Sequence, residues 1–519
     1  MSCLCEVQNC NFDTFKQSSM CVLHMQKKNL NSKELNCVAE DFDNKLVSYV
    51  IDYLDKREEK TVQSLNDNDL RSYLLENTEV HSFTQIRIND RLRHAITFDH
   101  ISFPKIDSFT GFNFVEILNK IEKIHFNYCF FECNYFKLEE SQTFYQDCTF
   151  LNWWNVGKAD ILANENSVLF QDCEFQEDVS ISKQSPLEFS LFNNCKFLKT
   201  LELSNQLINS SPFNNTDKVD LKCSKLKIEN CRFSAKFLFN NTKFDEVIIK
   251  DSIFEEKFEF KENFVDKFEI INSNFKKLFD AYKTKFINFR SFKSIYDDFV
   301  GFEKCQFGIS EKNSEEKVGS VSSFTYTTFM SFTNFRNTKF NSGLDFKNTN
   351  LKEPPNFLNT ELDTKFTNRE TFRVIKDSFD KIGNHIEANR FFVGEMQKYR
   401  EELKLKKGWS QEKVIFHLNY LVSDFGSSYV RPIMWILLTL YVFDLLVIGY
   451  EKNLLYKVVP IYNQEIAAVT GFLNSIASYA LPFKKFLLPG MELISLVFYI
   501  IIISLVWQAV NALKRHTKR

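Results

Sequence analysis

The chain has 519 residues and a formal net charge of −2, so it is long enough for several domains and has no general electrostatic attraction to nucleic acid. It has only eight histidines and 13 glycines, with no phosphate-binding glycine loop or nucleophile motif, so we expect a protein without enzymatic activity. Phenylalanine, with 57 residues, is the outlier of the composition. The first thirty residues lack an apolar stretch, which predicts no secretory signal, and we expect the cysteines to lie in a reducing compartment.

Residues 1–35 carry four potential metal ligands in two close pairs joined by a short loop. These ligands are Cys5, Cys10, Cys21 and His24. Three thiolates and an imidazole suit a tetrahedral zinc ion, and four protein ligands leave no open position for a catalytic water. The stretch resembles the small Cys3His zinc knuckles of bacterial and phage proteins, which implies a structural zinc. Cys3 is close enough to replace Cys5 as the first ligand, and free or redox-active cysteines are the alternative interpretation.

Residues 36–80 are predicted to form a helical cap. Over residues 36–76 apolar side chains recur at helical spacing opposite a polar stripe, and a second short helix is predicted over residues 67–75. The open end of a repeat structure exposes unpaired strand edges, so a covering helix is expected there. Extended segments are predicted to begin near Phe83.

One short phrase returns along residues 126–362: a polar corner residue, a small residue, any residue and a phenylalanine. Its copies end at Phe150, Phe175, Phe197, Phe233, Phe254 and Phe307. Roughly 21 to 25 residues separate most copies, which is the length of one solenoid coil. In an extended segment the small residue and the phenylalanine point to the same side, so we expect both to line the core while the preceding Asp or Asn turns a corner.

Between residues 323 and 362 the spacing tightens to about five residues, with threonine two positions before most aromatic or leucine residues. This pattern resembles the pentapeptide-repeat family, which implies a right-handed parallel β-helix over residues 81–366 and a mainly β fold class. An ordinary β-sandwich is the alternative, but its strands would not repeat the same phrase. The predicted core residues are Cys148, Phe150, Cys173, Phe175, Cys195, Phe197, Cys231, Phe233, Phe254, Phe307, Phe329, Phe335 and Phe340.

Residues 367–430 are predicted to form a helical hairpin linker followed by a basic segment. Thr367 or Asn368 can cap the first helix, and Gly383 and Asn384 supply the turn. The stretch resembles the junction in bacterial pentapeptide-repeat proteins that end in two membrane helices. Three residues near the hairpin could be taken for a metal or acid–base site, but we interpret them as solvated. They are His385, Glu387 and Glu395.

Residues 431–519 are predicted to form a two-span transmembrane hairpin. Residues 433–450 and 493–510 are each just long enough to cross a bilayer, and basic residues on both outer flanks place both termini in the cytoplasm, at the inner membrane. Asp444 lies within the first span, where a carboxylate needs a partner, water or a lumen. A short helix over residues 467–480 is predicted to carry a polar stripe of Thr470, Asn474 and Ser478.

The favoured function is a non-enzymatic, membrane-anchored cytoplasmic β-helix scaffold that binds or senses a protein partner or a signal ligand and forms a homo-oligomer. The first alternative is an oligomeric two-span ion channel or pore-forming effector gated by the β-helix, which family analogy connects with anti-phage defence. The second alternative is a DNA-mimicking topoisomerase binder, which the near-zero net charge and the membrane tether disfavour.

Overall fold

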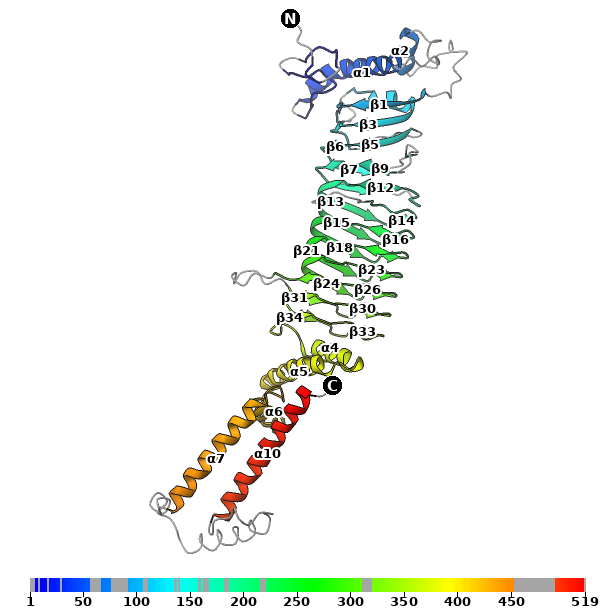
Figure 1. The fold of residues 1–519 in the computed structure, drawn as a ribbon. Helices are drawn as coiled ribbons and strands as arrows, with labels where there is room; N and C mark the ends of the chain where they lie inside the picture. The colour runs from blue at the N-terminus through cyan, green and yellow to red at the C-terminus, as the bar shows by residue number, and fades with distance from the viewer. Residues whose placement is uncertain are drawn as a thin grey trace. The chain divides into compact units, whose positions relative to one another are not determined.

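The computed structural model describes residues 5–7, 10–15, 18–28, 30–56, 67–75, 92–105, 111–134, 138, 141–156, 160–161, 168–181, 186–214, 221–309, 320–451 and 491–517. The chain divides into two compact units, Met1–Phe366 and Thr367–Arg519. The first unit is a parallel β-solenoid of about ten coils, as predicted, and the second is helical (Figure 1).

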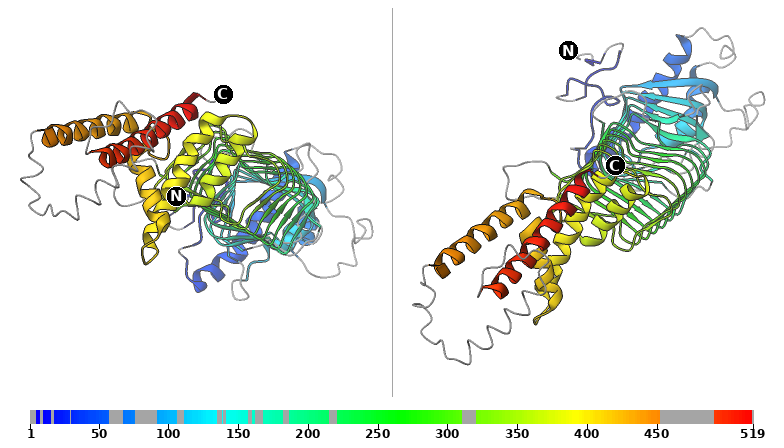
Figure 2. Two further views of the ribbon diagram at one scale, coloured as in Figure 1. Left: turned by 90° about the horizontal axis from the view of Figure 1, so that it is seen from below. Right: turned by 60° about the horizontal axis from the view of Figure 1, so that its bottom comes forward.

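Four parallel sheets run along the solenoid, and the coils stack around a shared interior (Figure 2). The 16-stranded sheet contains β2 (Ser102–Phe103), β4 (Phe130–Phe131), β6 (Thr149–Phe150), β7 (Trp154–Val156), β10 (Glu174–Phe175), β11 (Val179–Ile181), β13 (Lys196–Ser204), β15 (Leu221–Glu229), β18 (Thr242–Lys250), β21 (Phe264–Ile271), β24 (Lys285–Phe292), β27 (Gln306–Phe307), β28 (Ser322–Ser323), β31 (Lys339–Phe340), β32 (Leu344–Asp345) and β34 (Glu361–Leu362).

The other three sheets are shorter. The seven-stranded sheet contains β14 (Leu207–Ile208), β16 (Arg232–Phe233), β19 (Ile253–Phe254), β22 (Asn274–Phe275), β25 (Ile295–Tyr296), β29 (Thr328–Phe329) and β33 (Asn350–Leu351). The five-stranded sheet contains β17 (Phe237–Leu238), β20 (Phe258–Glu259), β23 (Phe279–Asp280), β26 (Val300–Gly301) and β30 (Thr333–Asn334). The six-stranded sheet contains β1 (Leu92–Asp99), β3 (Ile121–Asn127), β5 (Gln142–Gln146), β8 (Asp160–Ile161), β9 (Val168–Gln171) and β12 (Ser190–Asn193).

Each coil turns at residues with a positive φ, just before a strand begins. Asp147 has φ 51° and Asn230 has φ 53°, a region that Asp and Asn enter more readily than other residues with a Cβ. The first corner column precedes strands of the 16-stranded sheet and consists of His100, Tyr128, Asp147, Asp172, Asn194, Asn241, Glu262, Lys283, Lys304, Asn337 and Asn359. The second corner column precedes strands of the seven-stranded sheet and consists of Asn205, Asn230, Asp251, Asn272, Lys293, Tyr326 and Asn348.

The recurrent phrase occupies two corners of the coil, whereas the sequence interpretation placed it at one. Phe150, Phe175 and Phe197 are in register with one another in the 16-stranded sheet, but Phe233 and Phe254 are paired in the seven-stranded sheet. The longer gap in sequence between Phe197 and Phe233 marks this change of corner. In the last coils Phe329 and Phe340 lie in these same two sheets, with Phe335 between them, so a step of about five residues moves the chain to the next face of the coil.

Stacked aromatic rings fill the interior, and all thirteen predicted core residues are buried. One ring column in the seven-stranded sheet runs through Phe233, Phe254, Phe275, Tyr296 and Phe329. Neighbouring ring centroids in it are 4.6 to 5.1 Å apart and their planes differ by 3 to 10°. Strands that pair in register place an aromatic ring of one coil above that of the coil before it, which explains the high phenylalanine content.

The small residue of several phrases is a hydrogen-bond donor as well as a space filler. Thr338 Oγ1 donates to Phe302 O of the preceding coil at 2.6 Å, and Thr360 Oγ1 donates to Phe335 O at 3.0 Å. Cys148 Sγ makes the same bond to Phe126 O at 3.5 Å, which is a weaker bond because the donor is a thiol. Cys, Ser and Thr can therefore replace one another at this position.

Helices cover the first coil of the solenoid, as predicted. Helix α1 (Ser32–Asp55) begins at residue 32 rather than 36, because Asn31 and Glu34 form a capping box at its start. Its Phe42 packs edge-to-face on Phe103. Helix α3 (Phe114–Asn119) contacts β3, and α2 (Asp67–Leu75) contacts α1 and α3. The predicted strand start near Phe83 lies outside the described residues.

The second unit contains α4 (Arg369–Lys381), α5 (His385–Leu405), α6 (Gln411–Ser423), α7 (Val430–Glu451) and α10 (Glu492–Thr517). Asn368 caps α4 by accepting a hydrogen bond from Thr371 N, and Gly383 at φ 78° leads into the cap of α5 at Asn384. The hairpin α4–α5 is therefore built as predicted, whereas α6 was not predicted as a helix.

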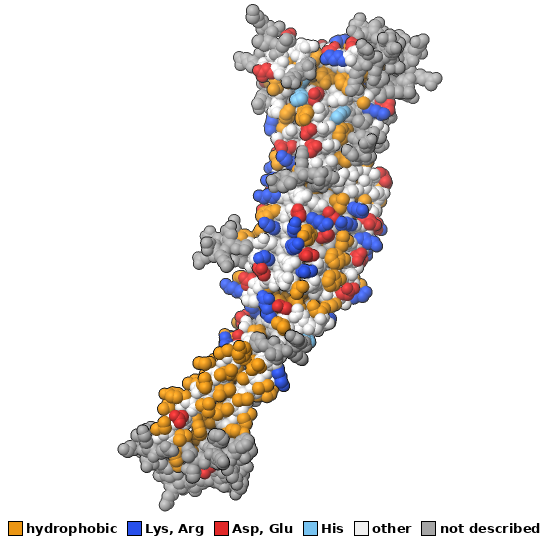
Figure 3. Space-filling model, viewed as in Figure 1, with side chains coloured by type: hydrophobic (Ala, Val, Ile, Leu, Met, Phe, Trp, Pro, Cys, Tyr) orange, Lys and Arg blue, Asp and Glu red, His pale blue; other side chains and the backbone are white. Residues whose placement is uncertain are grey.

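Helices α7 and α10 each contain a stretch long and apolar enough to cross a membrane. Their side chains form the large hydrophobic surface of the second unit in Figure 3. The two helices contact each other, with Phe443 and Phe498 ring centroids 5.1 Å apart. Asp444 is exposed on α7, whereas Thr470, Asn474 and Ser478 lie outside the described residues.

Candidate metal centre

Short turns bring the four predicted metal ligands together. Cys10 N donates to Val7 O at 3.2 Å, which closes a turn after the first ligand, Cys5. Cys21 O accepts from both His24 N at 3.2 Å and Met25 N at 3.0 Å, so the chain makes one tight turn that returns the imidazole to the Cys21 thiol. The two residues between Cys21 and His24 therefore form this turn.

The ligand atoms of Cys5, Cys10, Cys21 and His24 all lie within 4.8 Å of one another. His24 Nδ1 is 3.4 Å from Cys5 Sγ and 3.2 Å from Cys21 Sγ, and Cys10 Sγ is 3.7 Å from Cys21 Sγ. Bonds of zinc to sulfur and nitrogen in a tetrahedron separate neighbouring ligand atoms by about 3.5 to 3.8 Å. The donor set therefore fits one tetrahedral metal ion. Cys3, the alternative first ligand, lies outside the described residues.

Burial shifts the pKa values of Cys10, Cys21 and His24 in this cluster. Burial raises the pKa of the Cys10 thiol to about 12 and also raises the pKa of Cys21, so neither thiolate is favoured without a nearby cation. Burial lowers the pKa of His24 to about 4, which keeps the imidazole neutral and its nitrogen free to bind a metal. A bound cation would supply the missing charge and drive the thiols to the thiolate form.

The cluster is attached directly to the first coil. Ser102 N, at the start of β2, donates to Leu23 O at 2.8 Å, so the turn that carries Cys21 and His24 adds to the hydrogen-bond ladder of the 16-stranded sheet. Val22 and Leu23 are fully buried. The site is therefore a structural element of the solenoid end.

A buried Lys27–Glu132 pair holds the same junction. Lys27 Nζ donates to Ser102 O at 2.6 Å and to Met25 O at 3.0 Å, while Glu132 Oε1 accepts from Lys27 N at 2.6 Å. Burial lowers the pKa of Lys27 to about 7 and raises the pKa of Glu132. Sequence analysis missed this pair because its members are 105 residues apart and neither belongs to a motif.

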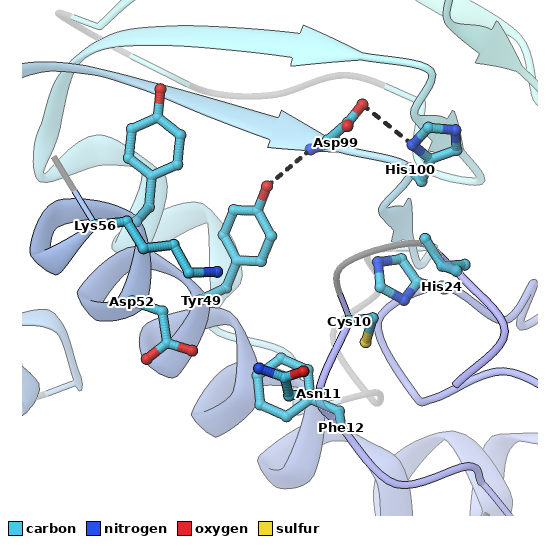
Figure 4. A pocket seen from close by; sticks show the side chains of 11 residues that line it. Cys10, Asn11, Phe12, His24, Tyr49, Asp52, Lys56, Asp99 and His100 are labelled. Carbon is cyan, nitrogen blue, oxygen red and sulfur yellow. Dashed lines mark hydrogen bonds and ion pairs between the residues drawn. The ribbon is translucent and has the colours of Figure 1, made fainter. Parts of the chain in front are cut away.

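A cavity of about 230 Å³ lies beside the cluster (Figure 4). Cys10 and His24 line one side of it, and Tyr49 and Asp52 of α1 line the other. Asp99 N donates to the Tyr49 hydroxyl at 3.2 Å, and this hydroxyl donates to Thr97 O, so its hydrogen-bonding capacity is used in packing α1 on β1. The cavity gives the Cys10 edge of the cluster access to solvent.

The residues at the hairpin of α4 and α5 contact polar or charged side chains close to them in sequence. His385 Nδ1 is 3.3 Å from Asp380, and Glu387 is 3.5 Å from Arg390. Glu395 was predicted to be solvated but is buried, where Lys376 Nζ lies 3.4 Å from its carboxylate. The prediction failed there because Glu395 follows the hairpin turn by several residues and lies on the face of α5 that packs on α4.

Comparison of the chain with protein-family models, with curated proteins and with solved structures gives no match. The resemblances to pentapeptide-repeat proteins and to zinc knuckles therefore stay predictions from the sequence, and the function has to be inferred from the geometry of the molecule.

Proposed function

We propose that the protein is a non-enzymatic scaffold that is anchored in the cytoplasmic membrane and binds a protein partner on the side faces of its solenoid. The observation that carries this proposal is the pairing, in one chain, of a stacked parallel solenoid with two exposed apolar helices. A solenoid offers a long rigid surface, and apolar helices of this length confine such a surface to a membrane.

The outer face of the long strands supports a binding role because its charges are ordered across coils. Glu246 on β18 lies between Lys225 on β15, at 2.6 Å, and Lys267 on β21, at 2.8 Å. Lys267 is also 3.3 Å from Glu269, whose carboxylate is 3.7 Å from Arg290. We call these five residues the charge ladder. Positive and negative side chains alternate along this face (Figure 3), which favours a mixed-charge protein partner over DNA mimicry.

Exchanging charges within the charge ladder tests the binding role. The double variant Glu246→Lys/Lys267→Glu keeps an ion pair between β18 and β21 with its charges exchanged, and it places like charges beside Lys225 and Glu269. We expect this variant to stay folded and membrane-bound and to lose its partner in cross-linking from intact membranes. Lys347→Glu, at an exposed position of the same unit, is the matched control. Unchanged cross-links in the double variant would contradict binding through this face.

The membrane anchor is proposed to span twice with both termini in the cytoplasm. Arg431 opens α7 and Lys514 and Arg515 close α10, which supports this orientation under the positive-inside rule. Alkaline extraction tests the insertion, and protease protection in sealed vesicles tests the orientation. Release of the intact protein by alkali would refute the anchor.

The metal centre is proposed to hold a structural zinc ion. The four donors leave no open position, and the cluster continues the ladder at Ser102, so the ion would stabilise the end of the solenoid. We expect about one zinc per purified chain, lost in Cys10→Ser but retained in Cys37→Ser, because Cys37 is exposed on α1. Metal-free protein with unchanged stability would refute this assignment.

An oligomeric pore is a second candidate because Asp444 is exposed within α7 and is the one charged residue between residues 433 and 450. A carboxylate facing lipid is costly, and assembly of several chains could turn it toward a water-filled lumen. Ion flux from liposomes containing the full chain, compared with Asp444→Asn, tests this candidate. If wild type and variant are both inserted and neither conducts ions, the scaffold is the better supported function.

A further inference from the structure

Among the residues that the structure describes, helix α6 has one packed face and one exposed apolar face. Phe416 packs on Tyr399 with ring centroids 5.0 Å apart and on Phe425 at 5.8 Å, and Tyr420 lies 6.1 Å from Phe425. Ser423, on the same side, is fully buried. This side therefore attaches α6 to α5 and to the loop before α7.

The opposite face of α6 is apolar and exposed. It presents Val414, Ile415, Leu418 and Leu421. Val414, Leu418 and Leu421 are three, four and seven residues apart, and Ile415 lies three residues before Leu418, which places all four on one side of the helix. An apolar stripe of this kind is not expected to face water on a helix that is otherwise well packed. We call these four residues the α6 stripe.

The α6 stripe lies on a helix that contacts the N-terminal turns of α7 and the C-terminal half of α10. Trp435 Nε1 of α7 donates to Leu421 O at 3.3 Å, and Ser423 Oγ donates to Gln508 Oε1 of α10 at 3.2 Å. Helix α6 thus contacts the first turns of α7 and the C-terminal half of α10. If these two helices cross a bilayer, α6 is located at its surface.

The segment before α6 has the composition of a membrane interface. Trp409 is 80% exposed and Leu405 is 86% exposed, although both are large apolar residues. Lys404, Lys406 and Lys407 are exposed beside them. Tryptophan prefers the headgroup region of a bilayer, and clustered lysines are attracted to anionic lipids.

We propose that residues 404–421 lie in the headgroup layer of an anionic lipid membrane, with the α6 stripe and Trp409 inserted and the lysines on the lipid phosphates. This inference rests on the proposed membrane anchor and adds a third contact to it. Phe416 packs on Tyr399 of α5, and Arg400 of α5 lies 3.7 Å from the centre of the Tyr420 ring. These contacts link the in-plane helix to α5, so the lipid contact fixes the direction in which the helical hairpin leaves the membrane.

Spin-label accessibility in nanodiscs tests the proposal on the full chain. A genetically encoded nitroxide replaces Leu418 in the α6 stripe or, as the matched control, Glu412 on another side of the same helix. In discs rich in phosphatidylglycerol we expect the label at 418 to be reached by oxygen and protected from a water-soluble nickel chelate, and the label at 412 to be reached by the chelate. Discs of phosphatidylcholine alone should reduce the protection at 418.

The outcomes separate this inference from the membrane anchor. Nickel access at 418 in protein that resists alkaline extraction overturns the in-plane helix but keeps the two spans, whereas extraction of the protein by alkali overturns the anchor. Protection of 418 from both reagents with spin coupling between chains would show that a second copy covers the α6 stripe and would overturn the lipid contact. Equal protection in both lipids would overturn the requirement for anionic headgroups.

Discussion

Removing one ring from a stacked column should destabilise the coils beside it. Phe275 is fully buried between Phe254 at 4.9 Å and Tyr296 at 5.0 Å, and the rings of Phe258 and Phe279 meet it edge-on. Paired strands hold these neighbours in place, so they cannot collapse into the space. We expect Phe275→Ala to lower the free energy of unfolding by about 4 kcal/mol, within the range measured for buried phenylalanines.

Ile295→Ala is the matched control for the Phe275 variant. Ile295 lies on the neighbouring strand β25 but points outward and is 40% exposed, so its loss should cost about 1 kcal/mol or less. Hydrogen exchange of the full-length protein in detergent micelles measures both variants. The faster exchange should be concentrated in β19 to β25 and should fade toward the first coils, because each coil contacts only its neighbours. Equal effects of the two variants would refute the role of the ring column.

Three further outcomes follow from single side chains. Burial raises the pKa of Asp43 to about 7, so between pH 4 and 7 the folded state keeps a proton on Asp43 that the unfolded chain has lost. Unfolding titrations should therefore show the free energy of unfolding falling by up to about 4 kcal/mol as the pH rises over this range. This part of the pH dependence should be absent in Asp43→Asn. Lys293 holds φ 52°, and Lys293→Asn should raise the unfolding free energy by up to about 1 kcal/mol, which denaturant titration measures. Lys267→Glu places a third acid beside Glu246 and Glu269 and should cost about 1 kcal/mol at low salt, with little loss at 1 M salt.

Much of the solenoid was predictable because its sequence repeats at the period of its coils. A small residue and a phenylalanine two positions apart predicted two side chains that point into the core, and the Asp or Asn before them predicted the turn between faces of the coil. The assignment of Cys195 and Cys231 to different corners was not predictable, because the phrase is the same at both and only the strand pairing distinguishes them. The turns at Lys293 and Tyr326 could not be predicted from the sequence either, since neither residue type favours a positive φ.

The clustering of Cys5, Cys10, Cys21 and His24 was predictable from their spacing in the sequence, whereas the groups that join the cluster to the solenoid were not. Cys21 and His24 are close in sequence because one tight turn positions both. Lys27 and Glu132 meet only after the first coil has formed. Helix α6 was missed because its stripe is short and the basic residues before it resemble a linker, and only the packing of Phe416 shows which side of the helix is covered.

The side-chain bonds between coils give the solenoid a direction of assembly. The hydroxyls of Thr338 and Thr360 donate to carbonyls that lie earlier in the chain, so a coil that forms during synthesis finds these acceptors already in place. The first acceptor of the backbone ladder is Leu23 O, in the turn that carries His24. We therefore expect the turn that carries Cys21 and His24 to offer the first acceptor to a forming strand, and each finished coil to offer the acceptors for the next.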